Sequence, residues 1–272
     1  MHSRTIAAAL LSSVTGLALC TVVTSDAGAA NKPSTTLRIL VTNDDGVTAP
    51  GINATVQALT ALPHTKVTVV APLTNQSGTG AKVTGSSVAV TNATTASGYP
   101  AKAVAGYPAD TIIWAIDDHG IAQRPELVVS GINLGENVGP FDALSGTVGA
   151  AQTALARGIP ALAVSQGVDN GQSANFSQGA KYLVAWVQTH RKALLAAKKG
   201  AAKSANGSLN VPTCATGHIR GPVNVTVAPS FSSYSVGTVD CSSTATKPST
   251  DVQAFVEGFA SISALHPVNP PN

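Results

Sequence analysis

Asn43, Asp44 and Asp45 stand together just beyond an apolar run, residues 37–41, with only Thr42 between, and Gly46 follows them. The length of the run suits a buried strand. Ligands of open parallel sheets bind beyond the carboxyl ends of the strands, so two adjacent carboxylates at that point could hold a metal ion or take part in a reaction. Asn-Asp-Asp-Gly could equally form only a turn, because these residue types favour turns through local hydrogen bonds.

Two more polar clusters follow predicted strands. The loop 74–80 contains Asn75 and Ser77, and Asn133 lies just beyond a later buried strand. Because the carboxyl ends of neighbouring parallel strands meet at one edge of a sheet, we expect the three clusters to share that edge.

This edge would offer two carboxylates, a hydroxyl and an amide oxygen as metal ligands. The four residues that carry them are Asp44, Asp45, Ser77 and Asn133. An oxygen-only set suits Mg²⁺, Mn²⁺ or Ca²⁺ rather than zinc or copper. The histidines give no zinc spacing, and this includes His64, His119 and His218.

Ser145, Gly146 and Thr147 begin a predicted helix of small residues. The free N–H groups and the positive dipole end of a helix N-terminus can seat a phosphate. Ser145 could also be an ordinary N-cap. A metal ion beside a phosphate seat would be suited to phosphoryl transfer to water.

Strands that alternate with helices position these residues. The predicted strands are 37–41, 66–71, 126–130 and 161–165, with an edge strand or hairpin arm at 83–91, and the predicted helices are 52–62, 108–116, 145–155 and 177–199. This alternation favours an α/β fold with a mostly parallel sheet and right-handed crossovers.

The chain beyond Gly200 is less regular. Short strands are predicted at 208–211 and 223–228, and a last one at 252–263. We therefore expect a core over residues 30–200 and an irregular C-terminal extension, residues 201–272, that completes the same domain.

Residues 1–29 have the pattern of a secretory signal peptide: a positive start, a short apolar centre and small residues before the cleavage point at Ala29. The apolar centre is short and diluted by polar residues for a membrane span. A lipoprotein cleavage site at Cys20 is disfavoured because Leu19 is large. We expect a secreted, periplasmic or extracellular protein, with Cys214 and Cys241 paired in the oxidising compartment.

The formal charge of +3 is too small to predict a nucleic-acid polymer or a stable membrane association as a partner. Charged residues make up only 11% of the chain, which is typical of an exported globular protein and not of a disordered one.

Several motifs, taken in order, resemble the SurE family of stationary-phase survival nucleotidases. The resemblance covers roughly residues 37–265. Its motifs are the opening segment 38–52, the pair 70–72 and 75–78, the Gly-x-Pro-x-Asp segment 106–110, the segments 128–133 and 145–148, and the late strands 209–212 and 250–263. The ordered set is far more specific than any single motif.

The resemblance implies a Rossmann-like three-layer fold and a divalent-metal-dependent phosphomonoesterase acting on nucleoside monophosphates, a 5′/3′-nucleotidase. It implies one Mg²⁺ or Mn²⁺ per site (Ca²⁺ could replace it in a crystal), held by the four residues named above. Asp44 and Asp45 become the catalytic acids, with Asp44 a candidate to orient or deprotonate water. The positions matching the phosphate site are Asn43, Asn75, Ser145, Gly146 and Thr147.

Residues 213–250 do not resemble the extended hairpin that many members use to exchange between subunits, and we expect a homodimer. Two alternatives to a nucleotidase remain: a broad-specificity secreted acid-type phosphatase and a non-catalytic, metal-stabilised binding module. A base-stacking side chain would favour the nucleotidase. The candidates are Tyr99, Tyr107 and Phe141, although packing in the core is the more common role of such residues.

Overall fold

The computed structural model describes residues 1–2, 36–168, 174, 176–196, 205–231 and 238–269. Most of the predicted signal peptide therefore lies outside the described residues. The described residues from Thr36 onward belong to one compact unit. Among the described helices, none combines the length and the apolar character needed to cross a bilayer.

Nine strands form a single sheet in the described part of the chain, in the order β3-β4-β2-β1-β5-β6-β7-β9-β8. The strands are β1 (Leu37–Thr42), β2 (Thr65–Pro72), β3 (Val90–Thr94), β4 (Pro100–Val104), β5 (Leu127–Leu134), β6 (Ala161–Gln166), β7 (Gly207–Val211), β8 (Pro222–Val225) and β9 (Ala260–Ser263). Every pair from β4 to β7 is parallel, while β3 and β9 run antiparallel to β4 and β7. The predicted mostly parallel α/β fold is confirmed.

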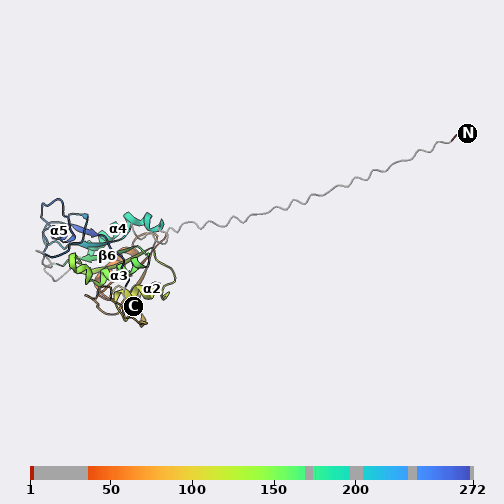
Figure 1. Cartoon of the computed structure of the whole chain (residues 1–272), viewed down its shortest axis with the longest axis horizontal. Helices are drawn as coiled ribbons and strands as arrows, with labels where there is room; N and C mark the ends of the chain where they lie inside the picture. The colour runs from red at the N-terminus through yellow and green to blue at the C-terminus, as the bar shows by residue number, and fades with distance from the viewer. Residues whose placement is uncertain (3–35, 169–173, 175, 197–204, 232–237, 270–272) are drawn as a thin grey trace. The chain divides into compact units, whose positions relative to one another are not determined.

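Helices cover both faces of this sheet, which makes three layers. They are α1 (Pro50–Thr60), α2 (Pro108–Ile116), α3 (Gly146–Ala156), α4 (Phe176–Ala196) and α5 (Asp251–Val256), with the 3₁₀ helix η1 (Gly139–Ala143) before α3. In Figure 1, α2 and α3 lie on one side of β6 and α4 lies on the other.

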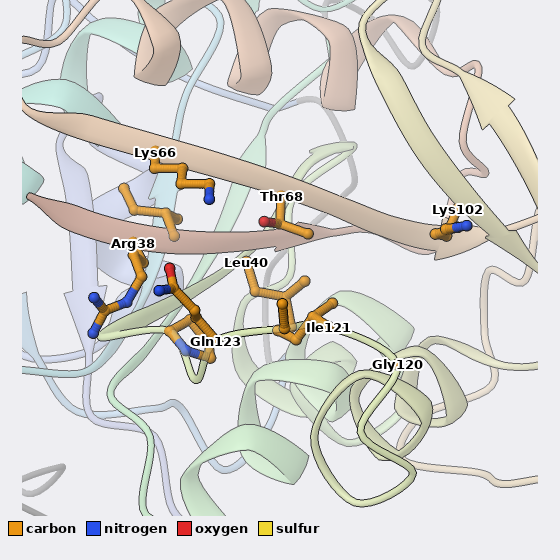
Figure 2. Close-up of a pocket in the computed structure, with 11 residues that line it drawn as sticks. Arg38, Leu40, Lys66, Thr68, Lys102, Gly120, Ile121 and Gln123 are labelled. Atoms are coloured by element: carbon orange, nitrogen blue, oxygen red, sulfur yellow. The ribbon is translucent and has the colours of Figure 1, made fainter.

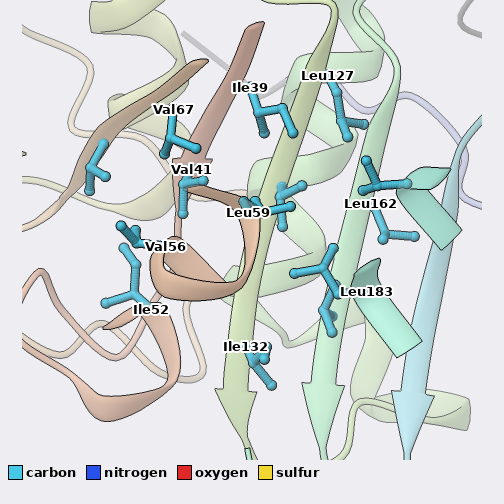
Figure 3. Packing of buried hydrophobic residues seen from close by; sticks show 14 of the residues in the cluster. Ile39, Val41, Ile52, Val56, Leu59, Val67, Leu127, Ile132, Leu162 and Leu183 are labelled. Atoms are coloured by element: carbon cyan, nitrogen blue, oxygen red, sulfur yellow. The ribbon is translucent and has the colours of Figure 1, made fainter. Parts of the chain in front are cut away.

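The alternation of side chains along β1 divides the core in two. Ile39 and Val41 pack with α1 and α4, whereas Leu40 packs with α2 and α3. Figure 3 shows the first of these clusters, in which Ile52 and Leu59 of α1 meet the sheet. Both faces of β1 are buried, and this explains the unbroken apolar run in its sequence.

β1 is the point from which the strand order proceeds both ways, to β2 on one side and to β5 on the other. Ligands of open α/β sheets bind at such a switch point, beyond the carboxyl ends of the strands. The paired acids come one residue after the end of β1, so the fold brings them to the place where a ligand is expected.

The C-terminal region completes this sheet. β7 pairs with β6, and β9 and β8 follow at the edge. The predicted strand at 252–263 is partly wrong, because its first part is the helix α5 and only the end is β9. Thr250 caps α5 by accepting a hydrogen bond from the backbone N–H of Gln253, 3.3 Å away.

The region between β2 and α2 also differs from the prediction. The edge strand or hairpin arm expected at 83–91 begins only at Val90, as β3, and lies at the edge of the sheet. It forms an antiparallel hairpin with β4, a strand that was not predicted. β4 begins at Pro100, and Pro is compatible with a strand at its first residue.

Candidate active site

Asp44 lies buried beyond the end of β1, with 3% of its surface exposed. The hydroxyl of Thr147, in the first turn of α3, donates a hydrogen bond to Asp44 Oδ1. The pKa of Asp44 is raised by burial, while this hydrogen bond and the backbone N–H groups of Gly146 and Thr147 act in the opposite direction. The N-terminus of α3 therefore supports the charged form of Asp44.

Asp45 is half-buried beside it and accepts a hydrogen bond from the backbone N–H of Leu134, 3.1 Å from Oδ2. Burial, followed by repulsion from the charge on Asp44, raises the pKa of Asp45 to about 6. Two neighbouring carboxylates that both resist ionisation indicate a site that a bound cation would stabilise.

The loop after β2 reaches the same edge. The backbone N–H of Gln76 donates to the carbonyl oxygen of Asp44 at 2.7 Å. Next along the chain, the backbone N–H of Ser77 donates to Oδ1 of Asn75 at 2.8 Å. Ser77 is thus one residue from a direct contact with Asp44, although Ser77 and Asn75 are both exposed.

The end of β5 supplies the fourth predicted ligand. Asn133 is 8% exposed, and its amide nitrogen donates to the carbonyl oxygen of Gly135 at 2.8 Å. This contact fixes which end of the amide is the nitrogen. Asn133 also directly precedes Leu134, whose backbone binds Asp45. The structure therefore brings all four predicted ligands to the same edge of the sheet.

Asn43 provides a separate indication of a polar ligand. Its Nδ2 donates to the carbonyl oxygen of Gly46 at 2.9 Å, but its Oδ1 is buried with no hydrogen-bond partner. A buried acceptor without a partner carries a desolvation cost that a bound ligand or water would offset. This atom lies in the residue directly before the two carboxylates.

The donor set fits a hard divalent cation. In the described part of the chain, no three His, Cys, Asp or Glu residues are grouped to hold a metal ion. Such a site would therefore need oxygen ligands from Ser77 and Asn133 in addition to the two acids. Carboxylate, hydroxyl and amide oxygens are ligands that Mg²⁺ and Mn²⁺ accept.

The start of α3 is also built closely around Asp44. Ser145 is the N-cap, and its hydroxyl oxygen accepts a hydrogen bond from the backbone N–H of Val148 at 3.1 Å. A Cβ atom on Gly146 would lie 2.8 Å from Cβ of Asp44, so any side chain there would displace the acid. The capping role of Ser145 is observed; the phosphate-binding role of this terminus stays a prediction.

Asp110 is a residue whose role the sequence did not predict. It is 4% exposed and accepts hydrogen bonds from the backbone N–H of Thr84, the hydroxyl of Thr84 and the backbone N–H of Tyr107. The carboxylate therefore ties the loop after β2 to the start of α2. Its place in the Gly-x-Pro-x-Asp segment, at the third residue of a helix, was the available signal.

Of the three aromatic candidates, two are packing residues. Tyr99 donates its hydroxyl to the carbonyl oxygen of Val67 at 2.9 Å, and Phe141 packs on Phe231 with ring centroids 4.5 Å apart. Tyr107 differs because it lines an open cavity beside the loop after β2.

Comparison with known proteins agrees with this geometry. Residues 39–232 match the model of the family described as survival protein SurE. The chain is 35% identical over 245 residues to the 5′-nucleotidase SurE of Geotalea daltonii, an alignment that covers 85% of this chain and 93% of that protein. A crystal structure of the SurE protein from Aquifex aeolicus superimposes with a TM-score of 0.65 at 26% identity, covering 84% of this chain and 93% of the other.

Other relatives match over a shorter stretch. The chain is 40% identical over 187 residues to the 5′-nucleotidase SurE of Methanopyrus kandleri, which covers 65% of this chain and 66% of the relative. It spans 48% of the protein of the same name from Methanocorpusculum labreanum, at 43% identity over 130 residues.

Proposed function

Because the chain belongs to the SurE family, we propose that it is a divalent-metal-dependent phosphomonoesterase that hydrolyses nucleoside monophosphates to nucleoside and phosphate. The observation that carries the proposal is the buried Asp44, held against Asp45 on one side and against the first turn of α3 on the other. An acid pair beside a helix N-terminus would suit metal-assisted phosphoryl transfer to water, because the acids could hold a cation and the helix end could seat a phosphate.

Asp44, Asp45, Ser77 and Asn133 would hold the cation. When bound, such a cation neutralises charge on the phosphate and lowers the pKa of a coordinated water. The chain's own contribution is rigidity: the hydroxyl of Thr147 and the backbone N–H of Leu134 fix one oxygen of each carboxylate. Preorganised ligands of this kind cost little reorganisation during the reaction.

The phosphate would lie against the side chains and backbone around α3 and β1. The residues proposed to line it are Asn43, Asn75, Ser145, Gly146 and Thr147. The unpartnered Oδ1 of Asn43 is an acceptor, and would suit a protonated phosphate oxygen or a water held next to it. Asp44 is buried and directly follows Asn43 in the chain. We therefore assign to Asp44 the role of orienting the attacking water.

We also propose that the protein is exported after cleavage at Ala29. The composition of residues 1–29 supports export, and so does the disulfide that joins Cys214 and Cys241, whose Cα atoms are 5.8 Å apart. N-terminal sequencing of protein recovered outside the cytoplasm of an expressing host would find residue 30 first if this is right. A homodimer is the proposed assembly, and light scattering would measure it.

Phosphate release tests the enzymatic proposal. We expect hydrolysis of an aryl phosphate that chelation abolishes and Mn²⁺ or Mg²⁺ restores; full activity after exhaustive chelation would reject metal dependence. A panel of 5′-AMP, 5′-GMP, 3′-AMP and sugar phosphates then measures breadth. Equal turnover across the panel would identify a broad-specificity phosphatase. If no ester were hydrolysed, the proposed enzymatic activity would be rejected in favour of the non-catalytic binding module.

A further inference from the structure

A cavity of about 450 Å³ opens beside the candidate site. The residues that matter to its chemistry are Leu73, Thr74, Gln76, Lys82, Thr84 and Tyr107. This volume is within the range of sites that bind small organic ligands, and is far larger than a phosphate needs. The cavity is therefore suited to the organic part of a phosphate ester.

Its walls are continuous with the candidate site. The backbone N–H of Gln76 binds the carbonyl oxygen of Asp44 at 2.7 Å. On the other wall, Tyr107 directly precedes Pro108, whose Cγ would lie 3.0 Å from a Cβ on Gly146 at the start of α3. A phosphate beside Asp44 and α3 would therefore have its leaving group next to this cavity.

Lys82 is the only formally charged side chain among the described residues that line the cavity. Its Nζ lies 4.8 Å from the centroid of the Tyr107 ring, a cation–π distance. Leu73, 51% exposed, adds apolar surface. The cavity thus combines an aromatic ring, an aliphatic side chain and one cationic donor, which is a surface for a flat ring with acceptor atoms on its edge.

The segment that carries Lys82 is anchored on both sides. The backbone N–H of Gly80 donates to the carbonyl oxygen of Leu144 at 2.9 Å. The backbone N–H of Lys82 itself donates to the carbonyl oxygen of Thr79 at 3.1 Å. Two residues later, the hydroxyl of Thr84 donates to Asp110 at 2.6 Å. The backbone of Lys82 is therefore held in position, although its side chain is exposed.

We infer that this cavity binds the base of the nucleotide and that Lys82 makes it selective for 6-oxopurines, guanine and hypoxanthine, over adenine. A 6-oxopurine presents two adjacent acceptors, O6 and N7, on one edge, and a lysine can donate to both. Adenine presents N7 beside an amino donor, which repels an ammonium group. The inference rests on the proposed function, because it takes the ligand to be a nucleotide.

Binding of free nucleosides tests the cavity without requiring catalysis. We expect calorimetric titration to give about tenfold tighter binding for guanosine than for adenosine, the size of a good lysine–guanine contact. Lys82→Met should reduce this ratio to near one, and Lys82→Arg, which keeps cationic donors, should largely retain it. Lys66→Met is the matched control, because Lys66 is an exposed lysine at a separate cavity near the start of β1 and β2 (Figure 2).

The same variants are then compared for hydrolysis of GMP and AMP. The ratio of kcat/KM for GMP to that for AMP should fall about tenfold in Lys82→Met and stay unchanged in Lys66→Met. Hydrolysis without a guanine preference, or a preference that survives Lys82→Met, overturns the inference and leaves the proposed function standing. Guanosine selectivity that depends on Lys82, in a protein that hydrolyses no nucleotide, rejects the proposed function alone. Failure of every nucleoside to bind overturns the inference.

Discussion

Thr147 donates a hydrogen bond to Asp44 from 103 residues away in the sequence. The contact joins the loop after β1 to the first turn of α3, and both residues are buried. It orients a carboxylate that burial would otherwise disfavour in its charged form. The proposed metal ligand Asp44 and the proposed phosphate seat at the start of α3 are thus joined by one hydrogen bond, and a change at either should affect both.

Thr147→Val tests this connection. The substitution preserves the shape but removes the hydroxyl, and hydrogen bonds to charged groups contribute about 1.5–3 kcal/mol. We expect Mn²⁺ affinity to fall by roughly tenfold or more, measured by calorimetry, with kcat/KM falling in parallel. Thr147→Ser keeps the donor and should stay close to the native protein. If Thr147→Val bound Mn²⁺ as tightly as the native protein does, the hydrogen bond from Thr147 to Asp44 would not contribute to metal binding.

Asp45→Asn should weaken metal binding strongly while the fold persists, because Asp45 is half-buried and its carboxylate repels that of Asp44. Removing this repulsion should keep the melting temperature of the metal-free protein at or above the native value. The matched control is Asp118→Asn, an exposed acid outside the site. An Asp45→Asn protein that fails to fold would mean that the acid pair is structural.

Gly146→Ala adds the smallest side chain at the point where α3 meets Asp44. The new Cβ would lie 2.8 Å from Cβ and 3.1 Å from Oδ2 of the acid, so the acid must move. We expect loss of metal affinity and of inhibition by inorganic phosphate together, by about tenfold or more if the orienting hydrogen bond is lost. If only the melting temperature changed, the start of α3 would have a capping role alone.

The position of the acids could be predicted from the sequence, but their contacts could not. An apolar run followed by Asn43, Asp44 and Asp45 identifies the end of a buried strand because both signals are local. The hydrogen bond from Thr147 to Asp44 depends on where the start of α3 packs relative to the end of β1. No local sequence pattern predicts that packing, because the two residues are far apart in the chain. The role of Asp110, which binds Thr84, was missed for the same reason.

The error at residues 252–263 has a similar origin. Val252, Ala254 and Phe255 are apolar enough to suggest a strand, and the segment is short. Asp251, which precedes them, is fully buried and accepts hydrogen bonds from the backbone N–H groups of Gly139 and Ala228. These contacts with distant segments hold the start of α5 and outweigh the local propensity.

Asp142 makes stability depend on pH. Burial, followed by repulsion from Asp251, raises the pKa of Asp142 from 3.8 to about 7, and its Oδ1 is buried with no hydrogen-bond partner. The folded state therefore holds this proton more tightly than the unfolded state. The protonated carboxyl of Asp142 therefore contributes most to the free energy of unfolding at low pH. That contribution, on the order of a few kcal/mol, is lost as pH rises from about 4 to about 7.

Asp142→Asn removes that titration. We compare the melting temperatures of the variant and the native protein at each pH, in scans with the same buffer ions. We expect the difference, variant minus native, to be larger at pH 8 than at pH 5. Asp118→Asn is the matched control, because it makes the same chemical change at an exposed position. Its melting temperature relative to the native protein should not differ between the two pH values. A gain at pH 5 that equals the gain at pH 8 would contradict the raised pKa.

The disulfide between Cys214 and Cys241 should be structural. It closes a loop across a sequence separation of 27, in a region with little apolar core of its own, and Cys241 is 5% exposed. The chain-entropy model gives a stabilisation of about 3–4 kcal/mol for such a loop. Gly258, in the turn between α5 and β9, packs closely on one end of the bridge, because an added Cβ there would lie 2.7 Å from Cα of Cys241.

Reduction, or the double change Cys214→Ser with Cys241→Ser, should therefore lower the melting temperature by several degrees. Hydrolysis should persist at moderate temperature, because none of the proposed metal or phosphate ligands contacts either cysteine through a described bond. Thiol titration of the unfolded, unreduced protein lacking residues 1–29 should find no free cysteine. Two free thiols per chain would reject the pairing, and would also remove one of the two observations that support export.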